Sequence, residues 1–170
     1  EMARDFADSA GESAPVDRIV MKYTPHDYQI EAINFLKIRS HQGAALLLDP
    51  GAGKTSMVLQ WLVDGGYKAI IVAPLRVIYG VWRQEAEKWD QFRHLKFSLV
   101  HGTPKQRVAA LEAEADIYLI NSEAMPWLAT QTLPEVDALV VDESTKFKST
   151  SAKRTKAICK MAIWFEHRVI

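Results

Sequence analysis

Apolar runs and amphipathic stretches alternate along the chain from residue 44 to its end. The run over residues 68–73 is continuous and rich in β-branched residues, which is typical of a parallel strand covered on both faces. The stretches between the apolar runs carry apolar residues at helical spacing, with charged residues on the other face. We therefore expect an α/β fold of three layers, a mostly parallel sheet covered by helices on both faces. The strands are expected over residues 44–48, 68–73, 97–100, 116–120 and 136–143, with another beginning at 168–170.

Capping and turn residues indicate where the helices begin and end. Thr24 is the expected N-cap of the first helix, and Pro25 its first residue. Gly65 or Gly66 is expected to end the second helix in the left-handed conformation. Thr103 is the expected N-cap of a later helix. The helices are expected over about residues 25–39, 55–63, 77–89, 104–113, 124–128 and 151–165.

Composition restricts the class of protein. The 170 residues suit one domain with a single core, and a hydrophobic fraction of 48% is that of a soluble globular protein. Lys and Arg number 21, as do Asp and Glu, so any nucleic-acid surface has to be a local patch. The single cysteine, Cys159, excludes an intramolecular disulfide and a cysteine-based zinc site. No apolar run approaches the ~18 residues of a membrane span, and no signal peptide is present. We expect a cytoplasmic protein, or one of the nucleoid or nucleus, that contacts no membrane.

A phosphate-binding loop follows the first expected strand. Residues 49–55 are Asp-Pro-Gly-Ala-Gly-Lys-Thr, between an apolar run and a helical pattern, which is the context that the P-loop motif requires. The glycines allow backbone N–H groups to face an anion, and Lys54 would reach the β- and γ-phosphates. Leu48 stands where the motif has its first glycine, so the match is imperfect. The residues expected to bind the nucleotide here are Pro50, Gly51, Ala52, Gly53, Lys54, Thr55 and Ser56.

Two carboxylates end a later strand. Asp142 and Glu143 follow an apolar run, and a carboxylate at the tip of a buried strand is costly unless it meets a cation. Asp142 is expected to hold Mg²⁺ opposite the Thr55 hydroxyl, and Glu143 to orient or deprotonate the attacking water. The alternative is a strand that turns acidic on reaching solvent. The candidate catalytic residues are therefore Lys54, Asp142 and Glu143, and the candidate metal ligands Thr55 and Asp142.

The unusual residue clusters of this chain all follow expected strands. They come after Leu48, Ala73, Val100, Ile120 and Val141. Because parallel sheets bind ligands beyond the carboxyl ends of their strands, we expect one composite site at that edge. Gln29, early in the first helix, has an amide that would either read a purine edge or face solvent.

These motifs resemble the first RecA-like domain of superfamily 2 helicases, and within them the Swi/Snf-type translocases. The resemblance extends from about residue 23 to residue 170. Residues 49–55 are similar to motif I, which in this family often lacks the first glycine, and residues 142–145 (Asp-Glu-Ser-Thr) are similar to the DEAD/DEAH-type box. Gln29 resembles the adenine-reading glutamine upstream of motif I. The shorter motifs that face nucleic acid have their counterparts in residues 73–76 with Trp82, in His101-Gly102 with Arg107, and in Asn121-Ser122-Glu123.

The resemblance implies a RecA-like P-loop NTPase fold that binds ATP and Mg²⁺ and contacts DNA or RNA through strand-end loops. It also implies a second RecA-like domain that supplies arginines to the ATP site. Residues 18–170 are then expected to be an ATP-binding domain that ends before this second domain and is nearly inactive alone. Residues 1–17 are expected to be a flexible lead-in or a cloning remnant. The nucleic-acid contacts implied are Pro74, Leu75, Arg76, His101, Gly102, Asn121 and Ser122.

Several interpretations stay open. A stand-alone P-loop kinase or phosphotransferase, or a non-enzymatic nucleotide-binding module, would also carry a phosphate loop. The tryptophans would either stack on bases or, at helical spacing, pack in the core. A basic cluster would either extend the nucleic-acid path or face solvent; it consists of Lys146, Lys148, Lys153, Arg154 and Lys156. The choice between DNA and RNA and the oligomeric state are left open by the sequence.

Overall fold

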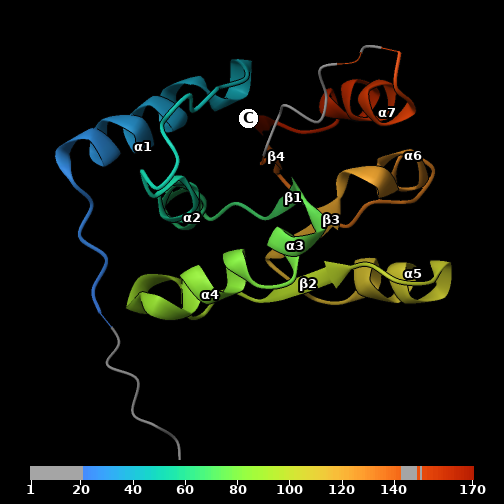
Figure 1. Ribbon diagram of the computed structural model, residues 1–170, viewed down its shortest axis with the longest axis horizontal. Helices are drawn as coiled ribbons and strands as arrows, with labels where there is room; N and C mark the ends of the chain where they lie inside the picture. The colour runs from blue at the N-terminus through green and yellow to red at the C-terminus, as the bar shows by residue number, and fades with distance from the viewer. Residues whose placement is uncertain (1–20, 143–148, 150) are drawn as a thin grey trace, which may run out of the picture.

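A parallel sheet runs through the middle of the molecule between two groups of helices (Figure 1). The computed structural model describes residues 21–142, 149 and 151–170. Within these ranges five strands pair in the order β2-β3-β1-β4-β5, and every pairing is parallel. The predicted α/β fold is thereby confirmed. The strands are β1 Ala69–Ala73, β2 Phe97–Val100, β3 Ile117–Asn121, β4 Ala138–Val141 and β5 His167–Val169.

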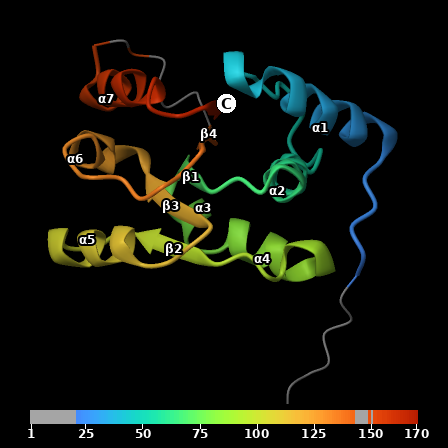
Figure 2. The ribbon, with the colours of Figure 1, turned by 180° about the vertical axis from the view of Figure 1, so that it is seen from behind.

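Helices cover both faces of this sheet. Their bounds are α1 Asp27–Arg39, α2 Lys54–Gly65, α3 Leu75–Ile78, α4 Val81–Lys88, α5 Pro104–Glu112, α6 Met125–Leu128 and α7 Lys153–Ala162, with 3₁₀ turns η1 Ser40–Gln42, η2 Asp90–Phe92 and η3 Ser122–Ala124. Figures 1 and 2 show α1, α2 and α4 on one side and α5, α6 and α7 on the other. None of the described helices is long and apolar enough to cross a membrane.

Successive side chains of β1 enter two separate buried clusters, one on each face of the sheet. Ile71 packs in a buried cluster with side chains of α1, α2 and α4, among them Leu36 and Trp61. Ile70 and Val72 pack in the cluster formed with α5, α6 and α7. Because successive side chains of a strand point to opposite faces, one apolar run supplies both clusters.

The segment that leads into the phosphate loop departs from its prediction. Ala44 donates its N–H to the Arg168 carbonyl at 2.9 Å and accepts from the Ile170 N–H at 2.9 Å, and Leu46 donates to the Ile170 carbonyl at 2.8 Å. Pairing stops there, and Leu47 is 88% exposed. The prediction of a buried strand over residues 44–48 is therefore wrong. The segment lies at the edge of the sheet beside β5, so it has a neighbour on one side among the described residues.

Local capping explains the other departures. The first helix begins at Asp27 with His26 as N-cap, because Gln29 Oε1 accepts from the His26 N–H at 3.0 Å, so Thr24 is not the cap. The helix expected over residues 77–89 is two helices, α3 and α4, since Pro74 caps the first and Gly80 the second. Two elements are also shorter than expected. The strand β4 covers four residues of the 136–143 run, and the helix α7 ends at Ala162 and not near residue 165.

Other sequence predictions are confirmed. Gly66 ends α2 with φ 66°, and Thr103 caps α5 through the Gln106 N–H. Trp61 and Trp82 are buried in the core, whereas Trp164 is 48% exposed. The expectations for residues 1–17, Glu143, Ser144, Thr145, Lys146 and Lys148 concern positions outside the described residues.

Candidate nucleotide-binding site

The phosphate loop is a tight turn between the sheet edge and α2. Gly51 and Gly53 have φ angles of 84° and 79°, in the left-handed region that glycine adopts without strain. Gly53 is the N-cap of α2, whose twelve residues begin at Lys54. The loop therefore leads directly to the first N–H groups of a helix, which carry partial positive charge and attract anions. This is the geometry expected of residues 50–55.

The Lys54 side chain folds over the loop. Its Nζ donates to the carbonyl oxygens of Leu48 and Asp49, at 2.7 and 3.0 Å. An ammonium has three N–H donors, so these two contacts orient Lys54 and leave a donor for a phosphate oxygen.

A cavity of about 290 Å³ lies beside the loop at the carboxyl end of β4. Lys54, Thr55 and Asp142, which are far apart in the sequence, line it together. Asp142 is held at the strand end by its N–H, which donates to the Val72 carbonyl at 2.8 Å. A hydroxyl and a carboxylate are oxygen ligands of the kind that Mg²⁺ prefers, so these residues fit that ion. The other lining residues are Leu46, Leu47, Leu48, Val58, Trp82, Val140, Val141, Val169 and Ile170.

Gln29 joins α1 to the phosphate loop. Its Nε2 donates to the Ala52 carbonyl at 3.0 Å, and its side chain is 7% exposed. The structure thus places Gln29 at the loop, and its expected role in reading adenine stays a prediction. Tyr28, which sequence reasoning missed, donates its hydroxyl to the same carbonyl at 3.3 Å. Its ring stacks on His26 with centroids 5.8 Å apart. The sequence could have indicated this contact, because Tyr28 directly precedes Gln29 in the first turn of α1.

The residues of the expected nucleic-acid path follow the carboxyl ends of β1, β3 and β2, which are neighbours in the sheet. Pro74 and Leu75 begin α3, and Leu75 is 43% exposed. Arg76 lies within α3. After β2, Gly102 has φ 97° and its carbonyl accepts from Arg107 Nε at 2.9 Å.

Two of these positions are less open than expected. Asn121 and Ser122 are buried, at 9% and 4% exposure. Asn121 Nδ2 donates to Glu123 Oε2 at 2.9 Å, and this hydrogen bond lowers the pKa of Glu123. The buried Asn121 Oδ1 has no hydrogen-bond partner. In contrast, Tyr79 is 56% exposed beside His101, with its hydroxyl 2.7 Å from His101 Nδ1, and was missed because α3 ends earlier than predicted.

Comparison with known proteins identifies the family. The model of the DEAD/DEAH box helicases matches residues 26–167. The chain belongs to the DEAD/DEAH box helicase family. It is also 33% identical over 162 residues to "Putative protein p41" of Acyrthosiphon pisum secondary endosymbiont phage 1, a match that covers 86% of this chain and 34% of the relative.

Solved structures match the fold of this helicase domain. The SWI2/SNF2 ATPase core of Sulfolobus solfataricus in complex with dsDNA superimposes with a TM-score of 0.69 at 22% identity, over 91% of this chain and 33% of the other. The SWI2/SNF2 ATPase core domain of the same organism gives a TM-score of 0.62 at 21% identity, over 95% and 34%. The chain thus spans about a third of the length of these relatives.

Ser56 and Glu85 form a partly buried contact that anchors the first turn of α2 in this helicase domain. Ser56, expected to bind the nucleotide, is 3% exposed and donates its hydroxyl to Glu85 Oε1 at 2.5 Å. Trp89 Nε1 and Lys88 Nζ also donate to Glu85, at 2.9 and 2.6 Å. Partial burial would raise the pKa of Glu85, but the hydrogen bonds from Lys88, Ser56 and Trp89 outweigh it and lower the pKa. The sequence spacing of Glu85, Lys88 and Trp89 indicates the contacts among these three residues. It does not indicate that Ser56 of α2 is a further partner of Glu85.

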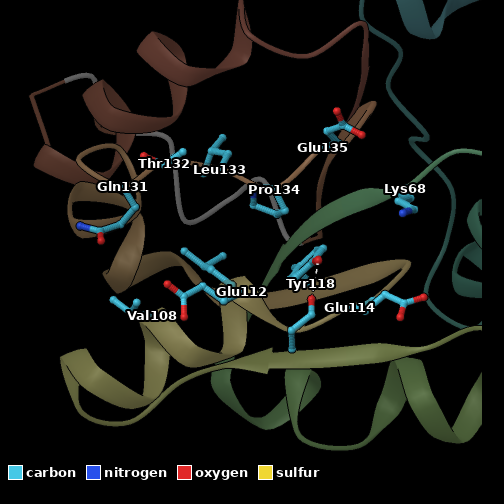
Figure 3. A pocket seen from close by; sticks show the side chains of 13 residues that line it. Lys68, Val108, Glu112, Glu114, Tyr118, Gln131, Thr132, Leu133, Pro134 and Glu135 are labelled. Carbon is cyan, nitrogen blue, oxygen red and sulfur yellow. Dashed lines mark hydrogen bonds between the residues drawn. The ribbon is translucent and has the colours of Figure 1, made fainter.

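A cavity larger than the one beside the phosphate loop lies elsewhere in this helicase domain (Figure 3). Its volume is about 650 Å³, and it lies at the amino ends of the strands, between α5 and the segment before β4. Tyr118 lines it with its hydroxyl donated to the Ala113 carbonyl at 2.8 Å. The cavity contains none of the predicted site residues. The smaller cavity beside the phosphate loop is therefore the candidate nucleotide site.

Replacing Gly53 with alanine tests the contact between Gln29 and the loop. A Cβ at Gly53 would lie 2.6 Å from Gln29 Nε2, whereas a Cβ at Gly51 meets nothing within 4 Å. Both Gly53→Ala and Gly51→Ala should cost about 1–2 kcal/mol from left-handed strain. Gly53→Ala should cost about 1 kcal/mol more, because Gln29 must leave the Ala52 carbonyl. Chemical denaturation measures both, and equal losses would contradict the role of this contact.

Acid titration tests the role of Glu85. Its folded-state pKa is lowered, so its stabilisation is present above its ordinary pKa of 4.5 and is lost as pH falls through the folded value. Glu85→Gln should lower the free energy of unfolding by about 1–3 kcal/mol at neutral pH. The difference from the wild type should shrink in acid. Denaturation curves across the pH range measure it, with Glu31→Gln, a change at an exposed residue of α1, as the control. A loss independent of pH would refute the ionic role.

Proposed function

We propose that this chain is the ATP-binding half of a nucleic-acid-dependent ATPase, which couples ATP hydrolysis to movement along DNA or RNA in a longer protein. The observation that carries the proposal is the convergence of Lys54, Thr55 and Asp142 on one cavity beside the phosphate loop. A phosphate loop alone binds many nucleotides for many purposes. A carboxylate at the carboxyl end of β4, lining the same cavity as the loop hydroxyl, is the arrangement that hydrolysis of a nucleoside triphosphate requires.

Each residue of the site has a distinct role in this proposal. The N–H groups of residues 51–55 and the Lys54 ammonium bind the β- and γ-phosphates. Thr55 and Asp142 hold Mg²⁺, which neutralises charge on the transferred phosphoryl group. Glu143, next in the chain, orients the attacking water. Gln29, already placed on the loop by Ala52, reads the base with the second N–H of its amide.

Nucleic acid is the second ligand of the proposal. The loops after β1, β2 and β3 are neighbours at the carboxyl edge of the sheet, and they offer backbone N–H groups, Arg76 and His101 to a sugar-phosphate chain. The SWI2/SNF2 ATPase core with the same fold is in complex with dsDNA, which favours duplex DNA as the first ligand to test. Lys153 and Lys156 are exposed on α7 and would extend the path.

A second RecA-like domain completes the site. Phosphoryl transfer in related enzymes depends on an arginine supplied from outside the phosphate loop, worth about 10³–10⁵ in kcat. The chain spans about a third of the length of its relatives, which leaves room in them for such a domain. We therefore expect the 170-residue chain to bind ATP weakly and to hydrolyse it little.

Substitution of Lys54 tests the nucleotide site. Lys54→Ala should abolish ATP binding to the 170-residue chain, because it removes the cation that contacts the phosphates. Binding of a fluorescent ATP analogue measures the effect. Lys105→Ala, which removes an exposed lysine on α5, is the matched control and should bind as the wild type does. If Lys54→Ala binds ATP normally, the assignment of the phosphate loop is wrong.

ATPase assays with nucleic acid test the coupling. In the full-length protein, duplex DNA should stimulate turnover, and Glu143→Gln should keep ATP binding while stopping hydrolysis. In the 170-residue chain DNA should have little effect, because the arginine from the second domain is missing. A rise of more than about tenfold in this shorter chain would contradict the need for a second domain.

A further inference from the structure

Two histidines and a glutamate meet at the amino end of β5, whereas the nucleotide site lies at the carboxyl ends of the strands. His167 is the first residue of β5, Glu166 precedes it, and His41 lies in η1 at the end of α1. Their candidate ligand atoms all lie within 4.8 Å of one another. Figure 1 shows the end of α1 beside the end of the chain, so segments more than a hundred residues apart form this cluster.

His167 is held rigidly within the cluster. Its side chain is buried, and its Nδ1 lies 2.8 Å from the Oγ of Ser40, which is itself fully buried. The ring packs against Tyr67, with centroids 4.1 Å apart, and against the edge of Trp61 at 5.7 Å. Since the hydrogen bond to Ser40 occupies Nδ1, Nε2 is the nitrogen available to a ligand. A hydrogen bond to the other ring nitrogen is what orients a metal-binding histidine.

His41 and Glu166 offer the other two ligand atoms of the cluster. His41 Nδ1 lies 3.5 Å from Glu166 Oε1, and the rings of His41 and His167 have centroids 4.1 Å apart. Zinc bonds of about 2.0–2.2 Å to nitrogen and oxygen put tetrahedral ligand atoms roughly 3.3–3.6 Å apart. The His41–Glu166 separation already has this value. Both side chains are exposed, at 51% and 68%, so an ion in solution can reach them.

We propose that His41, Glu166 and His167 bind a divalent transition metal ion of the zinc type, with water at the fourth position. Imidazole and carboxylate ligands suit Zn²⁺, whereas Mg²⁺ and Ca²⁺ prefer all-oxygen sites. The ion joins η1 to β5. Residues 44–46, which follow η1 directly, pair with residues 168–170, and the phosphate loop follows that segment. The metal ion therefore stabilises the attachment of this segment to the sheet and takes no part in hydrolysis.

Zinc binding to the metal-free 170-residue chain tests the proposal. Isothermal titration with Zn²⁺ should show one site per chain, and Co²⁺ in its place should give the visible spectrum of a tetrahedral site. The midpoint of thermal unfolding should rise by about 5 °C or more when free Zn²⁺ reaches about 100 times its Kd. Because these measurements need no nucleotide, failure here leaves the proposed ATPase function intact.

Substitutions in the exposed ligands assign the site without disturbing the core. His41→Ala and Glu166→Gln should each abolish the Co²⁺ spectrum and the zinc-dependent rise in unfolding temperature. Ser40→Ala should weaken zinc affinity by about 10- to 100-fold, the usual effect of losing an outer hydrogen bond. His94→Ala removes an exposed histidine outside the cluster and should bind as the wild type does. Absence of saturable binding by the wild type, or unchanged binding by His41→Ala and Glu166→Gln, would overturn the proposal.

Discussion

Backbone hydrogen bonds between residues 44–46 and residues 168–170 attach the phosphate-loop segment to the sheet. The rest of the candidate nucleotide site depends on this attachment, because it sets where the loop stands relative to the carboxyl end of β4. Beyond Leu46 the segment leaves the sheet and turns through residues 49–53 into α2. Asp142 is placed independently, by the pairing of β4 with β1. Thr55 and Asp142 line the same cavity because both attachments belong to one continuous parallel sheet.

A second contact holds the loop from the side of α1. The Gln29 amide spans from the His26 N–H to the Ala52 carbonyl, so one side chain both caps a helix and touches the loop. Glycine is required at position 53 for two reasons, its left-handed φ and the approach of Gln29 Nε2. A third contact, from Ser56 to Glu85, ties the first turn of α2 to α4. The loop is thus positioned by three contacts within the chain itself, and such preorganisation would lower the entropy lost on binding the proposed nucleotide.

The two ends of the sheet differ in chemistry. The carboxyl ends carry the phosphate loop, Asp142 and the loops proposed to follow nucleic acid, as expected for ligands of parallel sheets. The amino ends carry the cluster of His41, Glu166 and His167, along with the large cavity of Figure 3. The proposed metal ion would act on the same edge pairing that anchors the phosphate loop. The pairing of residues 44–46 with residues 168–170 therefore connects the proposed metal site to the phosphate loop.

The sequence by itself determined the features that are local or strongly periodic. The unbroken apolar run of β1, the left-handed Gly66 and the Thr103 cap depend on neighbours within a few residues, and each was predicted correctly. The phosphate loop and Asp142 were proposed from residue types, and the rule that ligands gather at the carboxyl ends of parallel strands predicted that they lie together. In the structure, Lys54, Thr55 and Asp142 line one cavity.

Only the tertiary structure decided which side chains meet across the fold. It placed residues 44–46 at the edge, where Leu47 is exposed, although an apolar run alone indicates a buried strand. It turned Ser56 toward Glu85 and brought His41 to His167, pairs that are 29 and 126 positions apart (85 − 56 and 167 − 41). Local propensity carries no information about such partners, because strand order and helix packing bring them together only when the whole sheet has formed.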